Sequence, residues 1–111
     1  MAVKADIIID QGSTYSTNLN LTDSSNNPVN LTGYVGRSQF RPSYDSNTAY
    51  SFTVSIPNPN TGVVILSLSA NDSSNVAFGK YLYDVELVDS GGNVTRIVEG
   101  ILTLTPEVTK L

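Results

Sequence analysis

Short apolar or alternating segments, each closed by turn-forming residues, constrain the fold of this chain more than any other feature. Seven such segments occur, at residues 6–10, 14–21, 34–41, 50–56, 64–68, 81–87 and 94–105. Clusters of glycine, proline, asparagine, aspartate and serine separate them. Because successive side chains of a strand point to opposite faces, the pattern predicts seven strands joined by turns. Only residues 70–78 lack it, and residues 71–74 there predict a single helical turn.

The number and spacing of these strands predict one all-β domain. Seven short strands with turns between them are typical of an immunoglobulin-like sandwich of two antiparallel sheets. A chain of 111 residues has the usual size of one domain, so we expect residues 1–111 to form a single unit. The sequence has no cysteine, so its core forms without disulfides, and no segment approaches the length of a membrane span.

Two tyrosines mark the sixth predicted strand as a central one. In immunoglobulin-like domains, a tyrosine near the start of this strand bonds back to the backbone, and a core position follows two residues later. Tyr81 and Tyr83 have this spacing. The other interpretation is that they are simply two alternating aromatic residues on one buried face. Under both interpretations the tyrosines are structural.

The residue types on which most catalytic and metal sites depend are missing. The chain has no histidine, cysteine or tryptophan, which excludes catalytic triads, thiol nucleophiles and the usual zinc ligands. Asp84 and Glu86 share a face, but a glycosidase needs two carboxylates across a cleft. We expect them to face Arg37 and Arg41 in a cross-strand charge ladder. The sequence therefore predicts a protein that is not an enzyme, with no catalytic residue, no cofactor and no metal site.

The charge of the chain argues against two large classes of partner. The net charge is −4, and the six basic residues are scattered along the sequence. A protein that binds nucleic acid or an anionic membrane needs a basic stripe or patch. We therefore expect no nucleic acid and no membrane among its partners.

Four apolar residues of the last two predicted strands form a candidate partner interface. If alternate residues of these strands enter the core, the outward set on the same sheet is Leu82, Val88, Ile97 and Ile101. An exposed apolar group of this size marks an interface more often than bare surface. The alternative is a bulge at Gly100, which would reverse the facing of part of the last strand.

Ile8 joins this candidate interface because three isoleucines follow one another in the first strand. Ile7 and Ile9 are expected in the core, which leaves Ile8 pointing away from it. The first strand is an edge strand in this topology, and one interpretation is that Ile8 packs against a neighbouring subunit. The alternative is that the strand crosses between the sheets near Gly12 and buries both of its faces within the domain.

Seven short motifs run in order through nearly the whole chain: DIIIDQG (6–12), NLTGY (30–34), RSQFR (37–41), LSLSA (66–70), GKYLYDVE (79–86), RIVEG (96–100) and PEVT (106–109). Together they resemble a family of small bacteriophage and prophage domains, similar to the immunoglobulin-like N-terminal domain of phage baseplate upper proteins. The resemblance implies a virion structural role near the tail tip or baseplate, without catalytic or cofactor residues. Baseplate upper proteins usually continue into a long part that carries or anchors receptor-binding subunits, whereas this sequence ends at Leu111. That difference favours an adaptor, a filler between larger subunits, or a head decoration protein.

We therefore expect a non-enzymatic virion structural protein, made in the host cytoplasm and located in the virion. Its expected role is that of a tail- or baseplate-associated adaptor or accessory subunit, bound to other virion structural proteins in several symmetric copies. One alternative is a decoration protein of the capsid. Another is a carbohydrate-binding or adhesive module, for which Tyr44 and Tyr50 are the candidate exposed aromatic residues.

Overall fold

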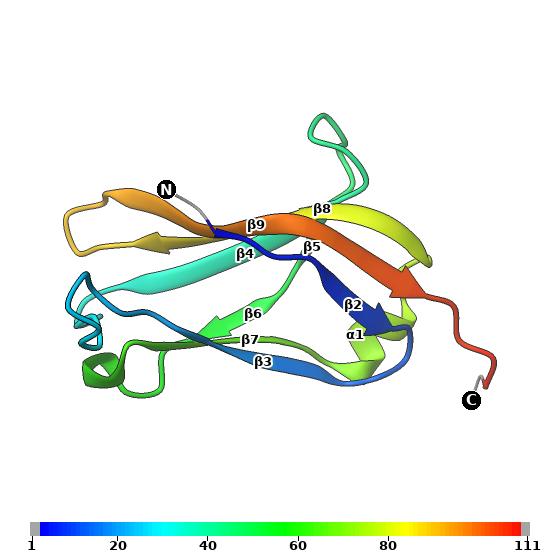
Figure 1. Ribbon diagram of the computed structural model, residues 1–111. Helices are drawn as coiled ribbons and strands as arrows, with labels where there is room; N and C mark the ends of the chain where they lie inside the picture. The colour runs from blue at the N-terminus through cyan, green and yellow to red at the C-terminus, as the bar shows by residue number, and fades with distance from the viewer. Residues whose placement is uncertain (1–2, 110–111) are drawn as a thin grey trace.

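Two β-sheets pack face to face in the computed structural model, which describes residues 3–109 (Figure 1). The larger sheet has the spatial order β1 (Val3–Lys4), β9 (Val94–Thr105), β8 (Gly79–Val88), β4 (Val35–Arg41) and β5 (Tyr50–Ser51). A sixth strand, β2 (Ile7–Asp10), follows β1 along the same strand β9. The smaller sheet contains β3 (Tyr15–Asn20), β7 (Val63–Leu68) and β6 (Thr53–Ser55). Both β1 and β2 pair in parallel with β9, and the other pairs of strands are antiparallel. The predicted immunoglobulin-like sandwich is confirmed.

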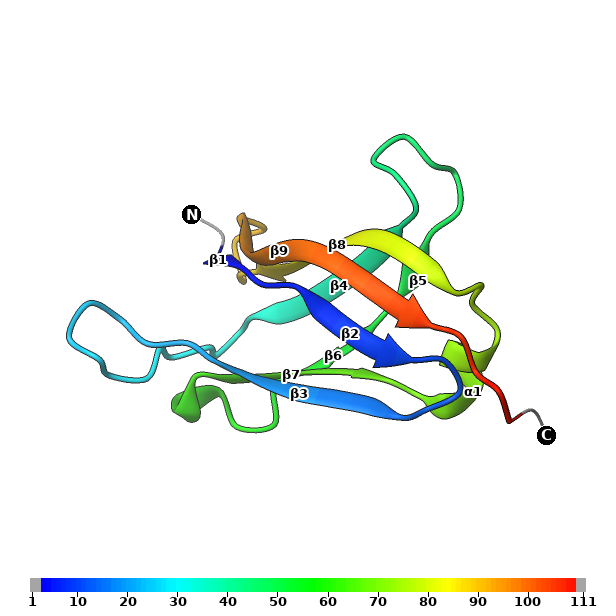
Figure 2. The same cartoon turned by 45° about the vertical axis from the view of Figure 1, so that its right-hand side comes forward.

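Two short helices close the turns of the smaller sheet. The 3₁₀-helix η1 (Pro59–Thr61) precedes β7, and α1 (Ala70–Ser74) follows it. The hydroxyl of Ser69 accepts a hydrogen bond from the backbone N–H of Asp72 at 3.1 Å and caps α1, which is the predicted helical turn. Ser73 is fully buried; its hydroxyl accepts from the N–H of Gly12 and donates to the carbonyl of Ser13. The helix is thereby attached to the turn between β2 and β3 (Figure 2).

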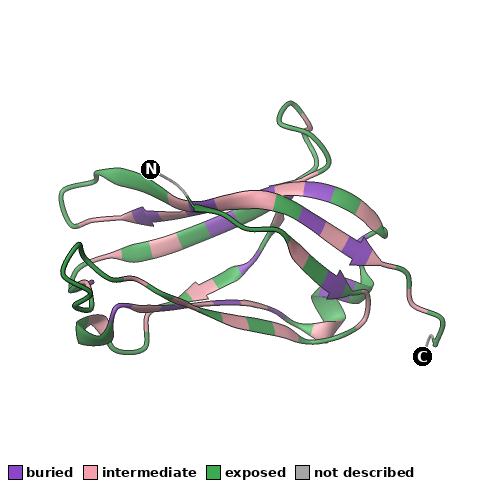
Figure 3. Cartoon of the chain, in the orientation of Figure 1, coloured by how far each residue is buried: buried purple, intermediate pink, exposed green. Residues whose placement is uncertain are grey.

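Aromatic side chains from both sheets fill the centre of the core. Phe40 of β4 is completely buried; its ring centroid lies 5.0 Å from that of Phe52 and 5.4 Å from that of Tyr81. Tyr50 stacks on Phe40 at 5.3 Å. Burial alternates along the strands of both sheets, as Figure 3 shows for β8 and β9. The alternation of apolar and polar residues in the sequence therefore places the apolar side chains of both sheets on their inner faces, where the sheets pack together.

Tyr81 and Tyr83 hold backbone segments that the sheets leave unpaired. The hydroxyl of Tyr81 donates to the carbonyl of Ala77 at 2.5 Å, which is the backward bond expected of the corner tyrosine. Tyr83 is buried, and its hydroxyl donates to the carbonyl of Ala5. Burial first, with smaller effects from Tyr15 and Asp6, raises the pKa of Tyr83 to about 12, so its hydroxyl keeps its proton at neutral pH.

The edge of the larger sheet is interrupted where Ala5 passes Gly100. Ala5 and Asp6 separate β1 from β2, although the register against β9 is the same on both sides. A side chain at Gly100 would collide with the carbonyl oxygen of Ala5, so the close approach requires glycine here. Side chains pair with the backbone groups that the break leaves without a strand partner. The Tyr83 hydroxyl donates a hydrogen bond to the Ala5 carbonyl, and the Asp6 carboxylate accepts one from the N–H of Ile101 at 3.0 Å. The break therefore leaves these two groups paired.

Residues 50–56 were expected to form one strand, and this prediction is wrong. β5 pairs with β4 in the larger sheet, whereas β6 pairs with β7 in the smaller one. Between them, Phe52 is buried and donates its N–H to the carbonyl of Ser38 at 3.1 Å. Alternation indicates which residues face the core, but both sheets share one core, so it does not indicate the sheet to which a residue belongs.

Replacement of Tyr83 by phenylalanine should lower the free energy of unfolding by about 1–3 kcal/mol, because the Ala5 carbonyl loses its donor while the ring remains. Tyr44→Phe is the control, since Tyr44 is 81% exposed, and it should change stability by less than about 0.5 kcal/mol. Chemical denaturation of the three proteins measures both effects. Equal stability of Tyr83→Phe and the unmodified protein would contradict the role given to this hydroxyl.

Candidate functional site

The outer faces of the two sheets carry different side chains. On the smaller sheet, the exposed strand residues are hydroxyl and amide residues: Ser16, Asn18, Asn20, Thr53 and Ser55. On the larger sheet, charged residues lie among exposed large apolar ones, four of which are Ile8, Val35, Val94 and Ile101. Exposed apolar groups concentrated on one face often mark an interaction site, so the outer face of the larger sheet is the candidate site.

An extra residue in β9 decides which side chains reach this face. The pairing of β8 with β9 shifts after Val85: Val85 lies opposite Val98, but Glu86 lies opposite Arg96, so Ile97 is left without a partner. Ile97 is directed inward and packs against the core. The prediction that Ile97 points outward is therefore wrong. The alternative prediction of a bulge in this strand is right, but its position at Gly100 is wrong: the bulge lies at Ile97, and Gly100 pairs regularly with Tyr83.

The other candidate interface residues lie on the outer face, in two groups. At the end of the sheet near the β8–β9 hairpin, Val88 lies between Val35 of β4 and Val94 of β9 in one cross-strand row. Val35 and Val94 are exposed and Val88 is partly buried. Val35 and Val94 were not among the predicted interface residues, because their pairing with Val88 follows only once the strand register is known.

The second apolar group lies at the opposite end of the same face. Leu82 of β8 pairs with Ile101 of β9, and Ile8 of β2 pairs with Thr103, two residues further along β9. Ile8 is 71% exposed and Ile101 41% exposed, while Leu82 is partly buried. Ile9 is buried and Ile7 packs against the core, as expected. Because Ile8 is exposed, the interpretation that the first strand buries both faces is wrong.

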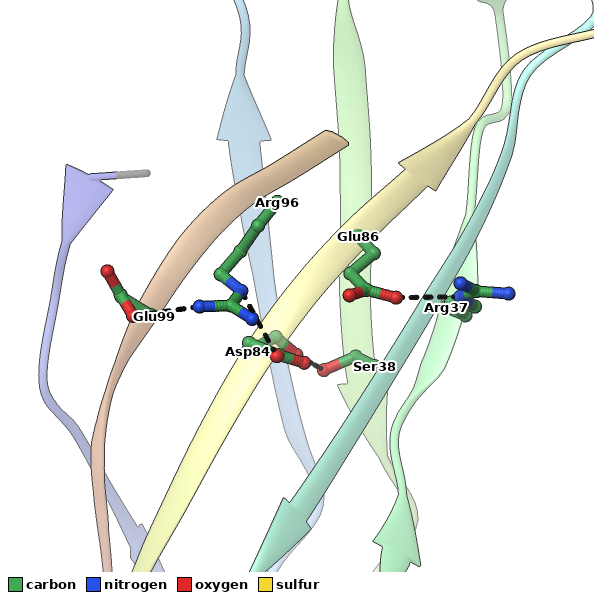
Figure 4. A network of polar contacts seen from close by, with 6 residues as sticks. All are labelled: Arg37, Ser38, Asp84, Glu86, Arg96 and Glu99. Carbon is green, nitrogen blue, oxygen red and sulfur yellow. Dashed lines mark hydrogen bonds and ion pairs between the residues drawn. The ribbon is translucent and has the colours of Figure 1, made fainter. Parts of the chain in front are cut away.

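A row of paired charges separates the two apolar groups (Figure 4). Arg37 Nε lies 2.8 Å from Glu86 Oε1. Arg96 lies between two carboxylates, with Nε 3.4 Å from Asp84 Oδ2 and Nη1 3.4 Å from Glu99 Oε1. Exposed pairs of this kind each contribute about 0.2–1 kcal/mol. Their main effect is to fix the charged side chains in place on the face.

The predicted charge ladder is right for Arg37 and wrong for Arg41. The register places Arg37 opposite Glu86 but Arg41 opposite Leu82, so Arg41 has no carboxylate across the strand. Arg41 instead donates to the carbonyl of Ser46 at 2.8 Å and to Gln39 Oε1 at 2.9 Å. Arg96 takes its place beside Asp84, because the extra residue Ile97 turns Arg96 outward.

Asp84 is the carboxyl group of this row whose environment opposes its charge. Burial raises the pKa of Asp84, repulsion from Glu86 raises it further, and Arg96 partly offsets both. The backbone carbonyl of Asp84 accepts the Ser38 hydroxyl at 2.5 Å, which fixes β4 against β8 at this point.

A groove of about 500 Å³ lies beside the charged row. Its lining includes Asp84, Glu99, Leu82, Ile101 and Tyr44. Tyr44 belongs to the loop between β4 and β5, which projects beyond the outer face (Figures 1 and 2). As expected, Tyr44 is exposed, but the matching prediction for Tyr50 is wrong because Tyr50 stacks on Phe40 in the core.

Within residues 3–109, no three histidine, cysteine, aspartate or glutamate side chains lie in an arrangement that could hold a metal ion. The same part of the chain has no helix with the length and apolar character needed to cross a membrane. The outer face of the larger sheet carries apolar side chains at two positions, with paired charges between them. This combination is common at protein–protein interfaces, where apolar contacts supply affinity and charges supply specificity.

Asp84→Asn should change how stability depends on pH. The pKa of Asp84 in the folded protein is raised above 3.8, so the folded protein holds the carboxyl proton more strongly than the unfolded one. The stabilisation from this proton is present below pH 3.8 and is lost as the pH rises through the folded-state pKa of Asp84. Asp84→Asn should remove this loss. Asp89→Asn is a control of opposite sign: hydrogen bonds from Asn93 lower the pKa of Asp89, so its contribution is lost as pH falls. Urea denaturation from about pH 3 to about pH 7 measures both slopes, and an unchanged slope in Asp84→Asn would contradict the assignment.

Neither a family model nor a curated protein matches the sequence. The fold is similar to that of CopC from Methylosinus trichosporium OB3b, at 15% identity and a TM-score of 0.49, over 96% of this chain and 90% of that one. An internalin-like protein of Listeria monocytogenes has 17% identity and a TM-score of 0.45, over 96% of this chain and 28% of its own. Murine CRIg has 12% identity and a TM-score of 0.42, over 92% of each chain. At these values the likeness carries no argument about function.

Proposed function

We propose that this chain is a non-enzymatic structural subunit of a bacteriophage virion, associated with the tail or baseplate, which binds other virion proteins through the outer face of its larger sheet. The observation that carries the proposal is the exposure of Ile8, Ile101, Val35 and Val94 on that one face. The virion assignment rests on the ordered sequence motifs that resemble phage baseplate domains.

The apolar groups of this face give a partner something to cover. Full burial of a valine or isoleucine side chain contributes about 1.5–3 kcal/mol relative to its exposed state. Ile8 and Ile101 lie at one end of the face and the valine row at the other. A partner that covers both apolar groups would gain burial free energy from each. Because the groups lie at opposite ends of the face, the partner has to lie along the face to reach both.

The charges between these groups suit a partner interface because they are already paired. Arg37 is bound to Glu86, and Arg96 to Asp84 and Glu99. A partner that covers them does not have to supply a counter-charge to every one. It does have to match their pattern, because like charges placed opposite one another across an interface cost several kcal/mol.

Purified virions of the phage that encodes this chain test the assignment. We expect the protein to remain with the particles, at about six to eighteen copies if it belongs to the tail, and in the hundreds if it decorates the head. Quantification against the major capsid protein separates the two locations. Absence from washed virions would refute the virion role.

Ile8→Lys tests the contact face directly. Because Ile8 is 71% exposed, the isolated variant should fold with unchanged stability, yet its incorporation into virions should fall at least tenfold, since a lysine would bury an unpaired charge under the partner. Thr53→Lys, exposed on the smaller sheet, is the matched control and should be incorporated normally. Normal incorporation of Ile8→Lys would exclude this end of the face from the contact.

Carbohydrate binding is a second candidate function because of Tyr44. This ring is 81% exposed above a groove that also contains the carboxylates of Asp84 and Glu99, and sugars bind to exposed aromatic rings beside polar acceptors. Under this alternative, Tyr44→Ala would abolish binding of the isolated domain to host envelope polysaccharide in a pull-down assay. Absence of polysaccharide binding by the unmodified protein would remove the alternative.

A further inference from the structure

The edge strands of the sandwich differ in how they are protected against pairing with another strand. Exposed edges carry unpaired N–H and C=O groups, and proteins block them with charges, breaks or very short strands. β5 has two residues and β6 has three. The edge formed by β1 and β2 is broken at Ala5, and carries Lys4, Asp6 and Asp10. Each of these edges has at least one protective feature.

The edge of β3 has none of these features. Its six residues pair with β7 at six consecutive positions without a shift, and β3 has no strand on its other side. From residue 14 to residue 22 the sequence contains no charged residue, no proline and no glycine. This is the longest unbroken edge in the part of the chain that the structure describes.

The free backbone groups of β3 occur at Ser16, Asn18 and Asn20. Leu21, just past the strand, donates its N–H to the carbonyl of Gly62 at 2.8 Å, on the side of β7. Because residues of an antiparallel strand direct their backbone groups alternately to one side and the other, residues 16, 18 and 20 direct theirs to the open edge. Their side chains are also exposed, on the outer face of the smaller sheet.

The inner face of β3 is incompletely covered at the same edge. Tyr15, Thr17 and Leu19 face the core but are only partly buried, whereas their direct partners on β7, Leu68, Leu66 and Val64, are buried. Another strand placed beside β3 would satisfy its free backbone groups and cover these three side chains together.

We propose that β3 pairs with β3 of a second copy of this chain, antiparallel, with a two-fold axis at Asn18. In this register each Asn18 forms a hydrogen-bonded pair with the other, and Ser16 forms one with Asn20 of the second copy, which uses all the free groups of both strands. Thr17 then lies opposite Leu19 of the second copy on the inner face. The smaller sheets of the two copies join into one continuous sheet.

A second copy fits this edge because the edge is uncharged and pairs with itself in register. The chain carries a net charge of −4, which opposes self-association elsewhere. Self-pairing of β2 centred on Ile8 would place Asp6 opposite Asp10, whereas self-pairing of β3 brings no like charges together. The dimer leaves the outer face of the larger sheet free, so this inference stands independently of the proposed function.

Cysteine cross-linking tests the register, because the natural chain has no cysteine. Residues of a hydrogen-bonded antiparallel pair have Cα atoms about 5.5 Å apart, within the range of about 4.4–6.8 Å that a disulfide spans. Asn18→Cys should therefore form a covalent dimer under mild oxidation. Thr53→Cys, exposed on the same sheet but on β6, should stay monomeric. Failure of Asn18→Cys to cross-link, or equal cross-linking of both variants, would overturn the proposal.

Sedimentation equilibrium of proteins without cysteine provides the second test. The unmodified protein should show a concentration-dependent mass of two chains, and Asn18→Lys should weaken dimerisation at least tenfold by placing two ammonium groups across the axis. Thr53→Lys should leave it unchanged, and circular dichroism should show that both variants are folded. A single-chain mass for the unmodified protein up to about 1 mM, or an unweakened Asn18→Lys dimer, would overturn the proposal.

Discussion

The extra residue at Ile97 determines what the larger sheet presents to its surroundings. Without it, the regular alternation of β9 would continue past Val98, placing Ile97 outward and Arg96 toward the core. With it, Ile97 packs inside and Arg96 reaches the carboxylates of Asp84 and Glu99. The position of Arg96 in the charged row and of Val94 in the valine row depends on this one change of register, whereas Leu82 and Ile101 lie in the regular part of the pairing.

The sequence predicts the sandwich well because alternation and turn residues are local signals. It places Tyr81 and Tyr83 in the core, since these positions follow from the period of a strand, whereas for Ile8 it leaves both an outward and a buried position open. It fails at Ile97, because a bulge changes the period without changing the composition. The candidate site was therefore predicted in part: Leu82, Val88, Ile101 and Ile8 reach the outer face, whereas Val35 and Val94 require knowledge of which strands are neighbours.

The outer faces of the two sheets differ in chemistry. The larger sheet combines apolar residues with paired charges on its outer face. The smaller sheet presents hydroxyl and amide groups, which hydrogen-bond equally well to water or to one another. One domain thus carries two outer faces, one apolar and charged and the other uncharged, on either side of a shared aromatic core.

Because β1 and β2 pair in parallel with β9, the first and last strands of the domain lie side by side and are joined directly by backbone hydrogen bonds. The first and last strands run in the same direction, so they leave the sandwich at opposite ends (Figure 1). A pull on both ends loads the six paired positions together in shear, whereas a hairpin pulled at its open end loses its bonds one after another. Tension applied to the two ends of the chain must therefore break the hydrogen bonds of all six paired positions together before either sheet can come apart.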